Sequence, residues 1–328
     1  MDGQLFLDYL SLILKQRKMT PIAGEQISFG DRTAFELGEI GACEFARRTK
    51  LLRKSIDITT VASQRTYDCP PDFIEIARKR RDRRTPCIAY LETGLTEPVL
   101  IDRVLYDDFW DNDTSQTEDI PTGFDIIKKS IAPATITGTT TSNGGETDGE
   151  CDLVNAAATF TDGDDLVYPR YRVYNTNPAK KYTGVVLEQT GDTTLNTAMF
   201  KGDTAKGKGW DSGDTYKIQN TCDWQLIFDY APSTVAETIT MEYYCFPPPV
   251  FHPFGMWGFP DPMNVYGVAI YAAWMMRFRE TSQSQHVNME AMKADKLFLM
   301  FEHFVESAIA IRSSREKILV PTAMMGIL

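Results

Sequence analysis

Apolar residues recur at helical spacing on both sides of the central part of the chain. Residues 4–18 carry a run of leucines followed by Lys and Arg, which predicts a short helix with cations at its C-terminal end. A second helix is expected from Asp31, a suitable N-cap, to a basic end near Lys54. The patterns over 265–281 and 287–312 predict two further helices.

Between these helices, alternating apolar and polar residues predict strands. Residues 56–67 are rich in Ile, Thr and Val and are expected to form a strand or a strand pair, and residues 88–110 return to strand-like alternation. The pattern is clearest over 223–230, where Trp, Leu, Phe and Tyr share one face, and over 238–245. These strands predict a small antiparallel sheet.

A change of composition marks residues 131–222. This segment holds 11 of the chain's 22 glycines and 17 threonines, and short β-like runs separated by turn residues replace the helical patterns. We predict an α+β protein: a helical body with a small antiparallel β-sheet, interrupted by an inserted all-β domain. The expected domains are the body (1–130 plus 223–312), the insertion (131–222) and an extended C-terminal tail (313–328).

Composition and residue spacing exclude several classes of function. The 328 residues include 45 acidic and 34 basic ones, and the net charge of -11 disfavours a general nucleic-acid coat. No apolar run approaches the roughly 20 residues that cross a bilayer, and no secretory signal is recognised. The six cysteines are never closer than 18 residues, and the three histidines stand alone. We therefore expect a protein of the cytosol that is not an enzyme and holds no metal and no cofactor.

Two basic clusters stand out against this acidic background. One holds six positive side chains within residues 78–84, and the other closes the second predicted helix. Such clusters can contact an acidic partner or phosphate, whereas the plain alternative for 78–84 is a solvated edge strand or hairpin. The candidate residues are Arg47, Arg48, Lys50, Arg53, Arg78, Lys79, Arg80, Arg81, Arg83 and Arg84.

Two apolar segments need a surface to cover them. Residues 246–262 contain six prolines, which present the aromatic side chains at low entropic cost either to the core of the same chain or to a subunit interface. The candidate interface residues are Phe251, Phe254, Trp257 and Phe259. The C-terminal tail is apolar and without helix caps. Its candidate docking residues are Ile318, Leu319, Val320, Pro321, Met324, Met325, Ile327 and Leu328.

The order of these elements and three local patterns carry a resemblance. The first pattern leads from Ile58-Thr59-Thr60-Val61 to Cys69-Pro70-Pro71-Asp72-Phe73, with one Pro more than the family's Tyr-x-x-Pro-x-Asp-Phe segment. The second is the aromatic strand at 224–230, then Tyr243-Tyr244 and the Pro-rich loop, and the third is Tyr271-Ala272-Ala273. On these features the chain resembles the head-to-tail adaptor proteins of tailed bacteriophages, of the podovirus tail tubular protein A type.

The insertion carries a resemblance of its own. It is similar to a small β module of phage virion proteins, and the two resemblances together cover most of the chain. The matching residues are Val173-Tyr174-Asn175, Gly184-Val185-Val186, Thr194-Leu195, Gly209-Trp210 and Gly213-Asp214-Thr215-Tyr216-Lys217-Ile218.

The resemblance implies a structural virion protein at the head-to-tail junction, assembled in the host cytoplasm. Such adaptors form a homo-oligomeric ring, typically a dodecamer, beneath the portal protein, where they extend the DNA channel and present a platform for the tail. The apolar tail is then expected to reach the portal, and the sheet side to face the tail. The β insertion is expected to decorate the outside or to contact tail fibre or nozzle proteins, and the basic clusters to contact neighbouring subunits or the portal. Genomic DNA is expected to pass without sequence-specific binding, and no membrane is involved.

Two other functions stay open. The chain could be a different tail structural protein, such as a nozzle or a fibre-docking protein. It could also be a virion protein that binds or cleaves glycans through an exposed Trp and carboxylates of the insertion, for which Trp210 is the candidate.

Overall fold

The computed structural model describes residues 2–14, 29–77, 88–91, 99–104, 117–118, 121–129, 135–144, 146–147, 150–160, 170–180, 182–201, 210–221, 223–232, 238–251, 255–281 and 287–318. The chain folds into two compact units, each assembled from separate stretches of sequence. Unit 1 comprises Met1–Leu52, Ile136–Ile218 and Phe246–Leu328, and unit 2 comprises Arg53–Thr135 and Gln219–Cys245. The predicted body is thus divided between two units, and the strands of the insertion lie in unit 1 with the helices.

The predicted fold class is wrong. Within the described residues, eighteen strands form sheets of seven, five, four and two strands, beside four helices. The protein is β-rich with a separate set of helices, and it is not a helical body with a small sheet. The error has a physical cause, because local periodicity shows where a strand lies but not which distant strand it pairs with.

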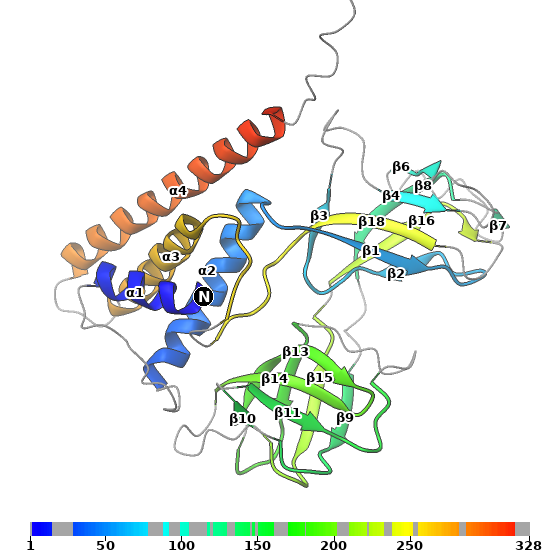
Figure 1. Ribbon diagram of the computed structural model, residues 1–328, viewed down its shortest axis with the longest axis horizontal. Helices are drawn as coiled ribbons and strands as arrows, with labels where there is room; N and C mark the ends of the chain where they lie inside the picture. The colour runs from blue at the N-terminus through cyan, green and yellow to red at the C-terminus, as the bar shows by residue number, and fades with distance from the viewer. Residues whose placement is uncertain are drawn as a thin grey trace, which may run out of the picture. The chain divides into compact units, whose positions relative to one another are not determined.

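The four predicted helices are confirmed, with shifted ends: α1 (Asp2–Leu14), α2 (Phe29–Thr49), α3 (Pro262–Thr281) and α4 (Val287–Ile318). Helix α3 packs against the other three (Figure 1). Their shared core is aromatic and fully buried. The Phe6 ring meets Trp257 edge-on at 5.4 Å, and it also covers Gly38, where an added Cβ would lie 2.7 Å from the ring. The helices are therefore held by a core that spans both ends of the sequence.

Helix α2 ends earlier than its basic sequence suggests. Lys50 adopts the left-handed conformation with φ of 52°, and its N–H donates to the Ala46 carbonyl at 2.8 Å. Arg312 of α4 donates to the carbonyl of the buried Thr49 at 2.6 Å, which caps the helix end. Only two of the predicted basic residues therefore lie on α2, and Arg53 opens the next strand.

The seven-stranded sheet of unit 1 is built from the sequence insertion. Its order is β10-β11-β14-β13-β12-β15-β9. The Thr140 N–H donates to the Asp214 carbonyl, and the Thr141 N–H donates to the Val154 carbonyl, so the sheet curls until its far strands meet. The strands are β9 (Thr135–Thr139), β10 (Glu146–Thr147), β11 (Glu150–Val154), β12 (Arg172–Asn175), β13 (Thr183–Gly191), β14 (Thr194–Lys201) and β15 (Thr215–Gln219).

A compact apolar core fills this curled sheet. Trp210 is fully buried in it, with its ring edge-on to Tyr216 and its indole N–H donating to Thr197 Oγ1 at 2.9 Å. This core is separate from the helical one. The insertion therefore has the internal packing that a small folding unit requires.

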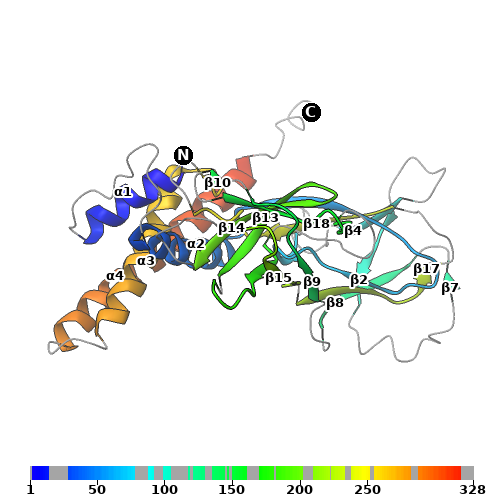
Figure 2. The same cartoon turned by 90° about the horizontal axis from the view of Figure 1, so that it is seen from below.

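Unit 2 contains two sheets that appear as two layers in Figure 2. One has the order β1-β18-β4-β5, with β3 also paired to β18, and the other has the order β2-β16-β8-β6. A short parallel pair, β17-β7, accompanies them. The strands are β1 (Arg53–Thr59), β2 (Thr66–Asp68), β3 (Phe73–Ile76), β4 (Ile88–Leu91), β5 (Val99–Leu100), β6 (Asp102–Arg103), β7 (Thr117–Glu118), β8 (Gly123–Lys128), β16 (Trp224–Phe228), β17 (Ala231–Pro232) and β18 (Thr238–Cys245).

The predicted strand pair at 56–67 connects the two sheets of unit 2. It is confirmed as β1 and β2, but each strand belongs to a different sheet. The hydroxyl of Tyr67 fixes the turn between them by accepting from the Val61 N–H at 3.0 Å and donating to the Gln64 carbonyl at 3.1 Å. This arrangement is similar to the tyrosine corner of β-sandwich proteins, where a hydroxyl satisfies the backbone of a turn.

Two glycines of β13 give a matched test of the packing in the curled sheet. A Cβ on Gly184 would lie 2.0 Å from the Ala198 carbonyl oxygen, whereas a Cβ on Gly191 meets nothing within 4 Å. We expect Gly184→Ala to destabilise the protein by about 1–3 kcal/mol or more through overpacking, and Gly191→Ala to change stability by less than about 1 kcal/mol. Urea unfolding of both variants measures the difference, and equal effects would contradict the packing described for β13.

Candidate functional site

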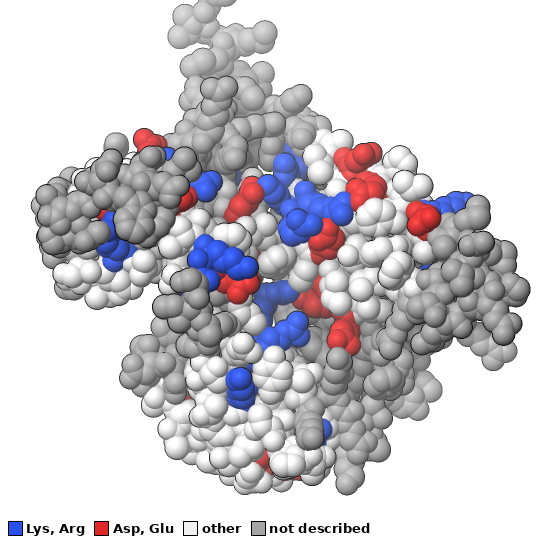
Figure 3. Space-filling model, turned by 180° about the vertical axis from the view of Figure 1, so that it is seen from behind, with Lys and Arg blue, Asp and Glu red and all other residues white. Residues whose placement is uncertain are grey.

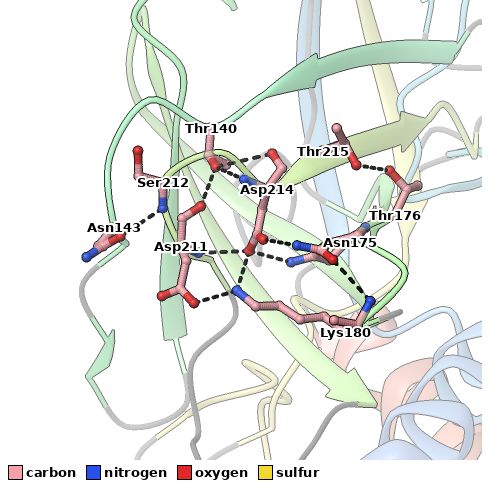
Figure 4. A network of polar contacts seen from close by, with 11 residues as sticks. Thr140, Asn143, Asn175, Thr176, Lys180, Asp211, Ser212, Asp214 and Thr215 are labelled. Carbon is pink, nitrogen blue, oxygen red and sulfur yellow. Dashed lines mark hydrogen bonds and ion pairs between the residues drawn. The ribbon is translucent and has the colours of Figure 1, made fainter.

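The densest polar network among the described residues surrounds Asp214 (Figure 4). The turn before β15 places it, because Gly213 adopts a left-handed φ of 87° and the Asp214 N–H returns to the Asp211 carbonyl at 3.1 Å. The Thr140 hydroxyl supports the same turn by donating to the Asp211 carbonyl at 2.5 Å. Asp214 is thereby held directly before the first residue of β15, with only 2% of its surface exposed.

The carboxylate of Asp214 accepts hydrogen bonds from four donors. Lys180 Nζ lies 2.5 Å from Oδ2 and also 2.7 Å from Asp211 Oδ2. The side-chain amides of Asn175 and Asn177 donate at 2.9 and 2.8 Å, and the Asp211 N–H donates at 2.8 Å. Three of these donors reach Oδ2, and the Asn177 amide reaches Oδ1. A buried charge is tolerated when it is paired and hydrogen-bonded in this way.

The surroundings stabilise the charged forms of Asp214 and Lys180. Burial raises the pKa of Asp214, but the hydrogen bonds from Lys180, the Asp211 backbone and the two asparagine amides outweigh burial and hold this pKa below its ordinary value. Burial likewise lowers the pKa of Lys180, but its hydrogen bonds to Asp211 and Asp214 and their negative charges raise this pKa overall. The pair is therefore an ammonium and a carboxylate at neutral pH.

This arrangement is suited to holding loops together. Its centre, where a bound cation would otherwise balance the carboxylates, is occupied by the Lys180 ammonium. Within the described ranges, no group of three or more His, Cys, Asp or Glu side chains could hold a metal ion. The network ties the turn at 211–214, the segment at 175–180 and the end of β9 to one another.

A second cluster joins the insertion to helix α2. The guanidinium of Arg170 bonds to the Glu39 carboxylate and the Pro247 carbonyl, donates to Cys43 Sγ at 2.7 Å, and lies 5.6 Å from the Phe246 ring centre. Arg170 reaches this position from a left-handed φ of 76°. Burial, and then the negative charge of Glu39, raise the pKa of the Cys43 thiol, so Cys43 stays protonated and is not a nucleophile.

The predicted basic residues on α2 are engaged within the chain. Arg47 pairs with Glu44 at 2.8 Å, and Arg48 pairs with both Glu44 and Glu302 while lying 5.5 Å from the Phe301 ring centre. Arg53 on β1 pairs with Glu242. On the face drawn in Figure 3, blue Lys and Arg side chains likewise lie beside red Asp and Glu. The cluster at 78–84 lies outside the described residues.

Of the two alternatives for the Pro-rich loop, the structure shows packing on its own chain. Phe251 and Trp257 are buried in the core of the helical part, and Phe259 packs against Phe45 with the ring centres 5.4 Å apart. Phe254 lies outside the described residues. In the C-terminal tail, Ile318 is the last residue of α4, and residues 319–328 lie outside the described part.

The glycan-binding alternative loses the aromatic side chain on which it depended. The expectation that the Trp of the insertion is exposed is wrong, because Trp210 is fully buried. An aromatic ring binds a sugar only through an accessible face, so Trp210 cannot serve as that platform in this fold.

The sequence interpretation missed the two polar clusters. The residues Gly213-Asp214 were among those that match the β module, but nothing in the local pattern linked Asp214 to Lys180, 34 residues away. Arg170 and Glu39 are separated by 131 residues, so no local signal could have paired them. The turn sequence Asp211-Ser212-Gly213-Asp214 before β15 is the local signal that could have pointed to the first cluster.

We expect the Lys180–Asp214 pair to make the stability of the insertion depend on pH. Because the folded pKa of Asp214 is lowered, its contribution is present above the unfolded pKa of about 3.9 and is lost as pH falls through the folded value. Urea unfolding followed from neutral pH to about pH 2 should show this loss. The variant Lys180→Met should show a smaller pH dependence in that range, and an unchanged dependence would contradict the pairing.

A comparison of two aspartates tests the network directly. Asp214→Ala leaves two amides and a backbone N–H without their acceptor and leaves the Lys180 ammonium with Asp211 alone, which we expect to cost about 2–5 kcal/mol of stability. Asp211 has a half-exposed side chain that accepts from Lys180, so Asp211→Ala should cost about 1 kcal/mol or less. Equal losses in urea unfolding would show that the site is not centred on Asp214.

Comparisons with known proteins do not place the chain in a family. No family model matches the chain, and searches of curated proteins and of solved structures give no match. Among the described residues, no helix is long and apolar enough to cross a membrane.

Proposed function

We propose that this chain is a structural subunit of a tailed-bacteriophage particle, which assembles into the adaptor ring between head and tail. The observation that carries the proposal is the exposure of large apolar side chains on all four helices of unit 1. Leu12, Phe278 and Leu299 have 69%, 64% and 62% of their surface exposed. Further exposed apolar residues of these helices are Ile40, Met263 and Ile311.

These side chains suit a subunit interface. A Leu or Phe side chain gains about 1.5–3 kcal/mol when it is fully buried, so covering a few of them on each neighbour stabilises a ring by several kcal/mol per contact. In a closed ring each subunit uses two different surfaces, and helices that each expose a large apolar side chain offer residues for both. The same helices are rigid, because Arg48, Arg312 and the aromatic core fix them to one another.

The order of elements supports the same proposal. Two helical segments, an inserted β module and a closing helix pair are the features on which the resemblance to phage adaptors rests, and the structure has helices and strands at these places. In this proposal the partners are further copies of the chain, the portal protein and a tail protein, and no chemical reaction is required.

Assembly with a portal protein tests the proposal. Mixed with the portal of its own phage, the chain should form a ring of many copies, visible by negative-stain electron microscopy and measurable by mass photometry. The double variant Phe278→Ser with Leu299→Ser should reduce ring formation about tenfold or more, since it removes two apolar side chains per interface.

The matched control changes exposed apolar residues of unit 2. Val61 and Trp224 are also exposed, so Val61→Ser with Trp224→Ser controls for the general effect of such substitutions. Circular dichroism should show native helix and strand content in both variants. A wild-type chain that stays free in the presence of portal and tail proteins would refute the proposal, and equal losses in both variants would refute the assignment to the helices.

A further inference from the structure

The sheet of unit 2 that contains β18 ends in an edge strand without a described neighbour. All seven residues of β1 pair with β18, from Arg53 opposite Tyr244 to Thr59 opposite Thr238, with no shift of register. In the order β1-β18-β4-β5, no described strand lies on the other side of β1. Half of the backbone N–H and C=O groups of an edge strand point outward, where they can pair with another strand.

The apolar face of this sheet is incomplete at β1. Ile56 and Ile58 share a face with Met241 and Ile239 of β18, which are fully buried. The two isoleucines of β1 are only half-buried. In the register argued below, a second copy of β1 would cover the outer side of Ile56 with the aliphatic stem of Lys54, and Ile58 would lie opposite Leu52, just before β1.

The usual protections of an edge strand are weak here. Edge strands are commonly short, bulged or interrupted by Pro, whereas β1 is seven residues long, regular and without Pro or Gly. Its charged side chains are directed to its own sheet and the adjoining turn: Arg53 pairs with Glu242, Lys54 Nζ lies 2.5 Å from Asp72, and Asp57 accepts from the Thr240 hydroxyl at 2.7 Å.

The sequence of β1 is complementary to itself in the antiparallel direction. When two copies pair about a twofold axis through Ser55, Arg53 of each copy lies opposite Asp57 of the other. Ser55 then faces its own equivalent. The side chains of Arg53, Ser55 and Asp57 all lie on the face of the sheet opposite to Ile56 and Ile58. An axis through Asp57 would instead bring two carboxylates together, and an axis through Ile56 would place Arg53 opposite Thr59. Arg53 and Asp57 lie between Glu242 and Thr240 of their own sheet on one side and the opposite charge of the other copy on the other side, so they can contact both. Opposite charges in directly facing positions favour the Ser55 register.

We propose that a second copy of this chain pairs with β1, so that two antiparallel β1 strands join two sheets into one continuous sheet. A twofold contact uses the same surface on both copies and cannot join neighbours in a cyclic ring. The contact therefore belongs to the unassembled chain and does not depend on the proposed function. It pairs the outward N–H and C=O groups of β1.

Charge exchange tests the register with the full chain. Sedimentation should show a dimer of the wild-type chain. Arg53→Glu and Asp57→Lys each place like charges opposite one another twice, so each should raise the dimer dissociation constant about tenfold or more. An equimolar mixture of the two variants restores opposite charges at both positions and should restore the dimer. A monomeric wild type, or a mixture that stays monomeric, would overturn the proposal.

Cysteine cross-linking gives an independent test that does not depend on charge. Ser55→Cys should form an intermolecular disulfide on mild oxidation, because directly opposed residues of antiparallel strands are close enough for one. Thr59→Cys is the matched control, being exposed on the same face but far from its own equivalent in this register. Cross-linking of both variants alike, or of neither beyond the wild type, would refute the Ser55 axis. Ring formation with portal is scored separately, so failure of the dimer leaves the adaptor proposal intact.

Discussion

The aromatic core of the helical part is the interaction on which the rest of the structure depends. Phe6 comes from α1, Phe45 from α2, Trp257 from the Pro-rich loop and Phe301 from α4, and all four are fully buried together. Each such side chain removes about 150–250 Å² from water on burial. Because these residues come from both ends of the sequence, their packing brings the chain at Leu52 and at Phe246 into one unit. Unit 2 and the curled sheet both lie between these positions along the chain.

Charge plays the complementary role inside each part of the fold. Asp214 and Lys180 cross-link loops of the curled sheet, Arg170 joins this sheet to α2, and Arg48 joins α2 to α4. The Lys180–Asp214 and Arg170–Glu39 pairs are largely shielded from water, which makes loss of one partner costly. The Arg48–Glu302 pair is partly exposed and contributes less. Among the described residues, the basic side chains of α2 and Arg53 therefore serve the fold by pairing within the chain.

Local physical chemistry explains which features the sequence could predict. Strands β16 and β18 carry strong alternation, and α3 and α4 are apolar-rich stretches too long for a strand, so all four were correctly located. The fold class was not, because sheet membership depends on pairs such as β1 with β18 that leave no local pattern. The same reason hid the candidate sites: Arg170 and Lys180 are ordinary surface residues by sequence, and only folding brings Glu39 and Asp214 beside them. The end of α2 shifted because Lys50 turns to the left-handed conformation, which basic composition does not signal.

The pairing of β1 with β18 also sets the order in which the chain can fold during synthesis. Arg53 and Glu242 are 189 positions apart, so at about 5–20 residues per second β1 leaves the ribosome roughly 10–40 s before its partner exists. All strands of the curled sheet emerge in that interval, and their contacts are closer in sequence. The curled sheet can thus form while both edges of β1 are still open. A nascent chain in this state is most exposed to strand pairing between neighbouring ribosomes, so slow translation through this stretch lengthens the period of risk.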